Sequence, residues 1–219
     1  MVPETEKPEA YSFLDVTSIE GRRLILAPLT ESDLIFLGKT LVSDTTWFTK
    51  TRGLSTPEKF ADYFRPMIER RKTGEAMTLV VRLAQDIPPG EKSSGGKRGE
   101  TVATSTFQYP TPGFLKIEIG FTWVADNWHR TFVNTEMKYL MLKHAFEVMG
   151  AKRVEFSVHP KNPKSNAAML RIGAKLEGTL RKWRFLPGAN GVGDDGNRNM
   201  YSIIDDEWPE ISARLSFHM

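Results

Sequence analysis

The sequence predicts a single α/β (α+β) domain, built on a mixed and mostly antiparallel sheet with helices on its faces. Short β-branched runs alternate with amphipathic runs of helical period, as in layered domains of this class. The clearest helix is predicted over residues 134–149, where apolar side chains recur at helical spacing until Gly150. Residues 101–109 and 116–124 are predicted to be antiparallel strands joined by a proline-containing turn.

The first half of the chain is predicted to add two strands and two helices. Residues 22–28 alternate apolar and polar side chains, as a half-buried strand does, and residues 30–33 offer caps for a helix. A second helix is expected after Thr56, with Pro57 at its first position, because its apolar side chains follow at helical spacing. Residues 77–83 form a further predicted strand.

The second half is predicted to end in a helix and a hairpin. Residues 153–158 have the composition of a strand, and residues 163–172 that of a helix ended by Gly173. A last hairpin is expected between residues 180–186 and 200–204, across a glycine-rich tip. The prediction is therefore about seven strands and about four helices.

Two segments are expected to lie outside this core. Residues 1–18 are polar and proline-bearing, with one possible short strand at 11–16, and are predicted to be an arm that packs only partly. Residues 19–219 then form the single domain. Within it, the Pro-Pro and Gly-Gly pairs of residues 86–100 predict a flexible surface loop without packing side chains.

The composition narrows the classes of function. The chain has no cysteine, so it has neither a thiol nucleophile nor the thiolate ligands of structural zinc, and its four histidines are too scattered to predict a metal site. No apolar run is long enough to cross a bilayer and no secretory signal is evident, so we expect a cytoplasmic protein that does not bind membranes. A net charge of +3 suits an anionic ligand but is weak for a nucleic-acid partner.

One segment combines features that could hold such an anion. A strand over residues 117–123, a turn over 124–130 and a helix opening at 131–136 follow one another directly. The unpaired N–H groups and the dipole of a helix N-terminus bind phosphate groups well. The alternative is that Asn134 only caps the helix, and both interpretations stay open at this point.

Residues 117–173 resemble the GNAT acetyltransferases, and specifically their RimJ/RimL-like branch of ribosomal-protein-type N-acetyltransferases. Residues 22–29 look like the opening strand of that branch, and residues 162–166 with 170–174 look like its Asn-x-x-Ser helix. The resemblance covers roughly residues 20 to 215. It implies the GNAT fold, with a sheet splayed in its middle, and the direct transfer of acetyl from acetyl-CoA to a primary amine without a metal.

The resemblance also implies a set of residues that contact the cofactor. The pyrophosphate loop departs from the usual family pattern, because His129, Phe132 and Asn134 stand where a glutamine or arginine and two small residues are common. The ring of Phe132 must then point away from the phosphates, and Gly120 is a plausible place for the bulge of the family strand. Asn162 can equally be a helix cap. The implied cofactor residues are Phe121, Thr122, Trp123, His129, Arg130, Thr131, Phe132, Val133, Asn134, Thr135, Asn162 and Ser165.

Glu118 is the expected general base, since it matches the glutamate of the branch's Ala-Glu-Ile-Gly pattern; the alternative is an ordinary solvent-facing strand residue. A second base position of the family falls on Ser157, which cannot act as a carboxylate would. The tyrosine acid of many relatives is missing. Tyr201 can replace it only if the last hairpin turns it inward, and otherwise water protonates the thiolate.

The acceptor is expected to be a primary amine, on a protein N-terminus or a small molecule, held by apolar residues. The implied residues are Trp47, Phe48, Phe64 and Trp183. A non-catalytic acyl-CoA sensor of the same fold is the main alternative, and either a monomer or a homodimer is compatible with the sequence. Residues 181–185 mix basic and aromatic side chains, which fits alternation on a strand better than nucleic-acid binding.

Overall fold

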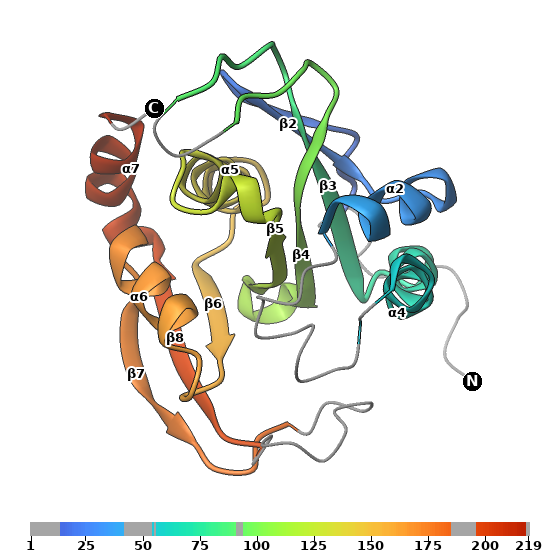
Figure 1. The fold of residues 1–219 in the computed structure, drawn as a ribbon. Helices are drawn as coiled ribbons and strands as arrows, with labels where there is room; N and C mark the ends of the chain where they lie inside the picture. The colour runs from blue at the N-terminus through green and yellow to red at the C-terminus, as the bar shows by residue number, and fades with distance from the viewer. Residues whose placement is uncertain (1–13, 42–53, 55, 91–93, 185–195, 218–219) are drawn as a thin grey trace.

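The computed structural model describes residues 14–41, 54, 56–90, 94–184 and 196–217. They form one eight-stranded sheet of order β1-β2-β3-β4-β5-β6-β8-β7 (Figure 1). All neighbouring strands are antiparallel except β5 and β6, which are parallel. The strands are β1 (Ile19–Glu20), β2 (Leu24–Pro28), β3 (Ala76–Leu83), β4 (Thr101–Thr111), β5 (Lys116–Val124), β6 (Arg153–Val158), β7 (Lys175–Leu180) and β8 (Arg198–Ile204).

The described residues include five α-helices. Helices α2 (Glu31–Leu41) and α4 (Pro57–Lys72) pack on one face of β3 and β4, and α5 (Val133–Lys143) lies on the other face (Figure 1). The last turns of α5 continue as a π-helix over His144–Val148. The remaining helices are α6 (Pro163–Ile172), which contacts β6 and β7, and α7 (Trp208–Phe217), which packs against α5. None of the helices in the described part of the chain is long and apolar enough to cross a membrane.

The predicted caps of α4 and α6 are confirmed, and the helical turns after α5 end at Val148, just before the predicted stop at Gly150, but the predicted cap of α5 is wrong. Thr56 and Asn162 cap α4 and α6, and Gly173 ends α6 in the left-handed conformation, with φ of 94°. The idea that Asn134 caps α5 is wrong, because the helix begins at Val133 and Asn134 lies inside its first turn. The hydroxyl of Thr131 accepts a hydrogen bond from the Val133 N–H at 3.3 Å instead.

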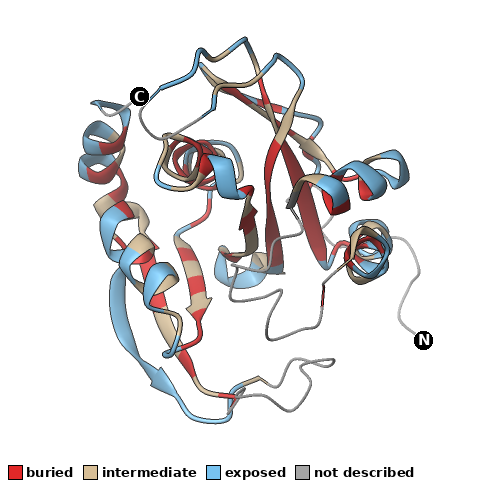
Figure 2. Ribbon diagram, viewed as in Figure 1, coloured by how far each residue is buried: buried red, intermediate tan, exposed pale blue. Residues whose placement is uncertain are grey.

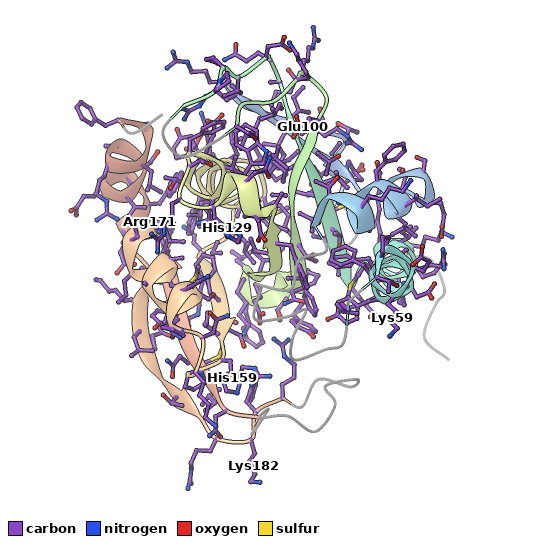
Figure 3. All side chains as sticks on the ribbon, viewed as in Figure 1. Lys59, Glu100, His129, His159, Arg171 and Lys182 are labelled. Atoms are coloured by element: carbon purple, nitrogen blue, oxygen red, sulfur yellow. The ribbon has the colours of Figure 1, made fainter. Side chains whose placement is uncertain are left out.

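The C-terminal part differs most from the prediction. Its first strand is β7, at residues 175–180. Residues 181–184 of the strand predicted over 180–186 are not in a strand, and residues 185–186 and most of the predicted tip lie outside the described part. Residues 181–182 form a turn, with Lys182 at the outer edge of the molecule (Figure 3). All six residues of β7 are exposed, so this edge strand lacks the alternation by which a strand is recognised (Figure 2). Helix α7 was not expected, although Trp208, Ile211 and Leu215 have helical spacing and are buried.

The two segments expected outside the core both contribute to it. Residues 14–18 form no strand, and Leu14 and Val16 are 4% and 1% exposed, so this end of the expected arm is packed. Residues 1–13 lie outside the described part. In the expected loop 86–100, Ile87 packs against the core and exchanges two backbone hydrogen bonds with Gly96. The expectation that this loop offers no packing side chain is therefore wrong.

Candidate active site

The sheet splits between its two parallel strands. β5 and β6 are paired only at Lys116–Arg153, Ile117–Val154 and Glu118–Glu155, and the pairing then ends. Beyond this point a cavity of about 530 Å³ lies between the two strands, the N-terminal part of α5 and α6. Of the residues labelled in Figure 3, His129 and Arg171 lie near one end of this cavity and His159 lies nearer the other. The splay that the resemblance implied is present.

A β-bulge shapes the β5 side of the cavity. Gly120 is opposite Thr106 and Trp123 is opposite Thr104, so Phe121 and Thr122 together face one residue of β4. Phe121 adopts a φ of 45°, which is uncommon for a side chain of its size. The bulge therefore follows Gly120 directly, and it redirects the backbone of β5 just where β6 leaves it.

Glu118 is buried at the point where the strands separate. Its side chain is 7% exposed, so the alternative of a solvent-facing strand residue is wrong. Gln108 donates a hydrogen bond from Nε2 to Glu118 Oε1 at 2.7 Å, and Arg184 Nη2 lies 3.6 Å from the same oxygen. Burial raises the pKa of Glu118 above its ordinary value, against the opposing effects of Arg184 and Gln108. A carboxyl group with a raised pKa is suited to exchange protons near neutral pH.

The position of the Gln108 side chain requires a glycine at residue 120. A Cβ atom on Gly120 would lie 2.5 Å from Gln108 Nε2, so the amide can lie across β5 to reach Glu118 only because residue 120 is glycine. Gly120 thus permits close packing of Gln108 as well as preceding the bulge. Gln108 Oε1 and Arg184 Nε are buried and have no hydrogen-bond partner among the described residues, which leaves one acceptor and one donor available beside Glu118.

The loop before α5 is held with Phe132 turned into the protein. The Phe132 ring makes an edge contact with Trp128, at 5.9 Å between centroids, and the Arg23 guanidinium lies 3.9 Å from the centre of the same ring. Arg23 is fixed in turn by Glu136 of α5, which accepts hydrogen bonds from the Arg23 backbone N–H at 2.8 Å and from Nε at 2.7 Å. Phe132 does not line the cavity, so its ring does not block the N-terminus of α5.

The cavity is strongly basic. Among the described residues that line it, Glu118 is the only carboxylate, whereas five arginine or lysine side chains apart from Lys138 take part. Such an excess of one charge in a cleft attracts an anionic ligand. We call these five side chains the basic rim: Arg130, Lys164, Arg171, Arg184 and Arg198.

Nine of the residues implied by the resemblance meet at this cavity. They are Glu118, Phe121, Thr122, Trp123, His129, Arg130, Asn134, Asn162 and Ser165. Four others belong to the loop and helix start behind it and do not line it, namely Thr131, Phe132, Val133 and Thr135.

Of the expected acid and acceptor residues, the three that the structure describes do not line the cavity. Tyr201 does turn inward, being 3% exposed, but its hydroxyl donates a hydrogen bond to Asn166 Oδ1 at 2.8 Å. Phe64 is fully buried and stacks on Phe60, so it belongs to the core and cannot contact an acceptor. Trp183 is 56% exposed and does not line the cavity. Trp47 and Phe48 lie outside the described residues.

Gln108, Arg184 and Lys138 are among the side chains of the site that the sequence analysis does not predict. Lys138 is the most unusual, because its buried ammonium group reaches the cavity from α5 and donates to Thr122 Oγ1 at 2.6 Å and Ser105 Oγ at 3.1 Å. Burial lowers its pKa to about 7. Its place on the helix gave a signal, because it precedes the buried Met141 by three residues and Ala145 by seven, and so lies on the apolar face.

Comparisons with known proteins agree with this geometry. The family model of the acetyltransferase (GNAT) domain matches residues 23–175. A curated relative, the uncharacterized N-acetyltransferase YoaA of Bacillus subtilis (strain 168), is 28% identical over 105 residues. That match covers 48% of this chain and 56% of YoaA, so the chain spans about half the length of this curated relative.

Solved structures share the fold over nearly the whole chain. A crystal structure from T. thermophilus, described as a proposed acetyltransferase, has a TM-score of 0.73 and 28% identity, and the match covers 93% of this chain and 97% of that one. Mycobacterium smegmatis RimJ in complex with CoA-disulfide has a TM-score of 0.65 at 18% identity, covering 89% and 88%. Because the family model matches well over half of the sequence and the splayed sheet is present, this chain belongs to the GNAT acetyltransferase family.

Proposed function

We propose that this protein transfers an acetyl group from acetyl-CoA to a primary amine, with Glu118 as the general base. The observation that carries the proposal is the position of Glu118, a buried carboxyl group of raised pKa at the point where β5 and β6 separate. It is the only acidic side chain among the described residues of a cavity whose other charged groups are basic.

The residues of the cavity fit the cofactor. The first turn of α5 offers backbone N–H groups beside Asn134, and Arg130 precedes it in the loop, so this end suits a pyrophosphate. Lys164 and Arg171 of α6 extend the positive charge on the other side of the cavity. The bulge at Phe121 and the neighbouring unpaired edge of β5 suit the amide groups of an extended pantetheine chain. When bound, acetyl-CoA supplies an acyl group activated as a thioester.

The side chains around Glu118 suit an amine. Glu118 takes up the proton that the amine loses as it attacks, while Gln108 Nε2 and Arg184 hold the carboxylate in one orientation. Gln108 Oε1 has no partner among the described residues, and it adds a second acceptor for an N–H group. A primary amine has several N–H groups to place against these two acceptors, whereas a hydroxyl has one, so we favour an amine on a protein N-terminus or a small molecule.

One observation favours a second candidate, a non-catalytic acyl-CoA sensor. The hydroxyl of Tyr201 is engaged by Asn166, so the tyrosine proposed as the acid is not available at the cavity. A sensor needs no group to protonate a leaving thiolate. It would bind acetyl-CoA through the same residues and release no thiol with any amine.

Calorimetric titration with acetyl-CoA, followed by thiol release against a panel of amines, tests both candidates. We expect micromolar to millimolar binding and thiol release with at least one class of amine: peptides with free N-termini, arylalkylamines or polyamines. Binding without thiol release across the panel would favour the sensor. No heat of binding at millimolar acetyl-CoA would refute both candidates.

The role of Asn162 can be separated from its role as a helix cap. Its side chain accepts a hydrogen bond from the Ser165 N–H at 3.1 Å, and it also lines the cavity. We expect Asn162→Ala to lower the free energy of unfolding by about 1 kcal/mol and to weaken acetyl-CoA binding. Thr56→Ala removes the corresponding cap of α4 at a residue that does not line the cavity, and it should cost a similar free energy without changing binding. Urea unfolding and calorimetry measure the two effects, and equal binding by both variants would limit Asn162 to capping.

A further inference from the structure

Lys138 places a cation inside the gap between β5 and β6. Its ammonium group is bonded to Ser105 of β4 and to Thr122 in the bulge of β5. It also lies 5.9 Å from the centre of the Phe156 ring, on β6. One side chain of α5 thus reaches both borders of the gap, and it lines the cavity there.

This cation has no anionic partner in the described part of the chain. None of the ion pairs found there includes Lys138, and burial lowers the pKa of its ammonium group to about 7. Two of its three N–H groups are used by the hydroxyls of Ser105 and Thr122, which leaves one donor. The other titratable or charged side chains that line the cavity are the basic rim, His129, His159 and Glu118.

A purely structural role would not require a lysine at this position. Burying a charge is unfavourable, and an apolar side chain of similar length would fill the same space without that cost. The polar surroundings of Lys138 hold the ammonium toward the cavity without neutralising it. A buried ammonium group that faces the cavity and has no anionic partner in the described part of the chain is suited to stabilise a negative charge on a ligand. Such a charge would be present in the cavity only when the ligand is bound or reacts.

Lys138 and Glu118 lie on opposite faces of the sheet. Glu118 is opposite Gln108 in the pairing of β4 with β5, and Ser105, three residues from Gln108, points to the other face, where α5 lies. A group that approaches Glu118 and a group that departs toward Lys138 would therefore use opposite sides of the gap. The phosphate groups of the cofactor have other partners, because the basic rim and the helix N-terminus lie around the cavity.

We propose that Lys138 binds the sulfur atom of coenzyme A and stabilises the negative charge on it when the thioester bond breaks. This inference rests on the proposed function. As the amine nitrogen forms its bond to the acetyl carbon, the C–S electron pair moves onto sulfur, and the ammonium group of Lys138 balances that charge or gives sulfur a proton. The proton from the amine goes to Glu118, and exchange with water returns both residues to their starting states.

The pKa of the bound thiol gives a test that needs no acceptor. Coenzyme A is bound to the protein, and thiolate absorbance in the ultraviolet is followed as the pH is raised. With the wild-type protein, we expect the thiol of bound coenzyme A to titrate about one to three pKa units below that of free coenzyme A. Lys138→Met should remove this shift while leaving the dissociation constant of acetyl-CoA within about threefold, since the thioester carries no charge at sulfur.

Two further variants control the test. Lys143→Met removes a lysine from the same helix that is half exposed and faces Glu147, and it should leave the thiol shift unchanged. Lys138→Arg keeps a cation and should retain part of the shift, so it carries the test if Lys138→Met does not fold.

A wild-type thiol that titrates like free coenzyme A, or a shift that survives in Lys138→Met, would overturn the inference alone. Equal loss of coenzyme A and acetyl-CoA binding in Lys138→Met, with the thiol shift retained, would assign Lys138 to a phosphate instead. Absence of binding to the wild type would overturn the proposed function as well.

Discussion

Glu118→Gln is expected to slow thiol release by roughly 10²- to 10⁴-fold, the usual contribution of a positioned general base. The amide keeps the size of the side chain and its contact with Gln108, but it cannot accept the proton of the amine. The dissociation constant of acetyl-CoA should change little, because the variant leaves the basic rim intact. Steady-state thiol release and calorimetry on the same samples measure the two quantities.

The pH dependence adds a second signature of Glu118. Burial raises its pKa, so the wild-type rate should rise as the pH increases through that raised value, and Glu118→Gln should lose this limb. The folded state favours the protonated form, so the stabilising contribution of Glu118 is present at low pH and is lost as the pH rises through its pKa in the folded protein. Glu118→Gln, which cannot ionise, should therefore be at least as stable as the wild type at neutral pH.

A surface carboxylate provides the control for this variant. Glu75 pairs with Arg70 at 3.3 Å and its side chain is 60% exposed, so Glu75→Gln should leave both the rate and its pH profile unchanged. If Glu118→Gln retained the wild-type rate, another group or a water molecule would be the base, and Glu118 would be left with a structural role.

Glu136→Ala is expected to cause the largest loss of stability, about 3 kcal/mol. The carboxylate is fully buried and binds Arg23, which directly precedes β2. Because the Arg23 side chain is 21% exposed, we place the loss at the lower end of the range for a broken buried pair. Arg23 lies against the Phe132 ring, so the loop before α5 should also loosen and acetyl-CoA should bind more weakly. Urea unfolding and calorimetry measure these losses.

The exposed pair of Glu69 and Lys72 on α4 offers a matched comparison. Both side chains are about two thirds exposed, so Glu69→Ala should change the free energy of unfolding by less than about 1 kcal/mol. A loss as small as this in Glu136→Ala would show that Arg23 finds another partner and that the loop does not depend on the pair.

Most of the fold could be predicted because its signals are local. The cap at Asn162, the proline that follows it and the stop at Gly173 lie within one short segment, and they fix α6 at both ends. β7 could not be predicted in the same way. All of its side chains are exposed, and only pairing with β8 makes it a strand. Pairing with a strand that follows some twenty residues later leaves no periodic pattern in the sequence.

The residues of the candidate site also differ in how far the local sequence predicts them. The resemblance to a family motif predicts Glu118, but the burial and the contacts of this side chain follow from the packing of distant segments. Arg184 is far from Glu118 in the sequence and comes to lie beside it only in the folded chain. Lys138 differs from these residues, because the local helical spacing alone is enough to predict that its charged side chain lies on the apolar face of α5.

The short pairing between β5 and β6 divides the sheet into two parts, one from β1 to β5 and the other from β6 to β8. Three residue pairs join the two parts. The carboxylate of Glu155 stabilises this pairing, because it forms ion pairs with Arg153 at 2.8 Å within β6 and with Lys116 of β5 at 3.1 Å. None of these three charged residues lines the cavity. We therefore expect that substitutions at Glu155, Arg153 or Lys116 can change the spacing of β5 and β6 without replacing any side chain that lines the cavity.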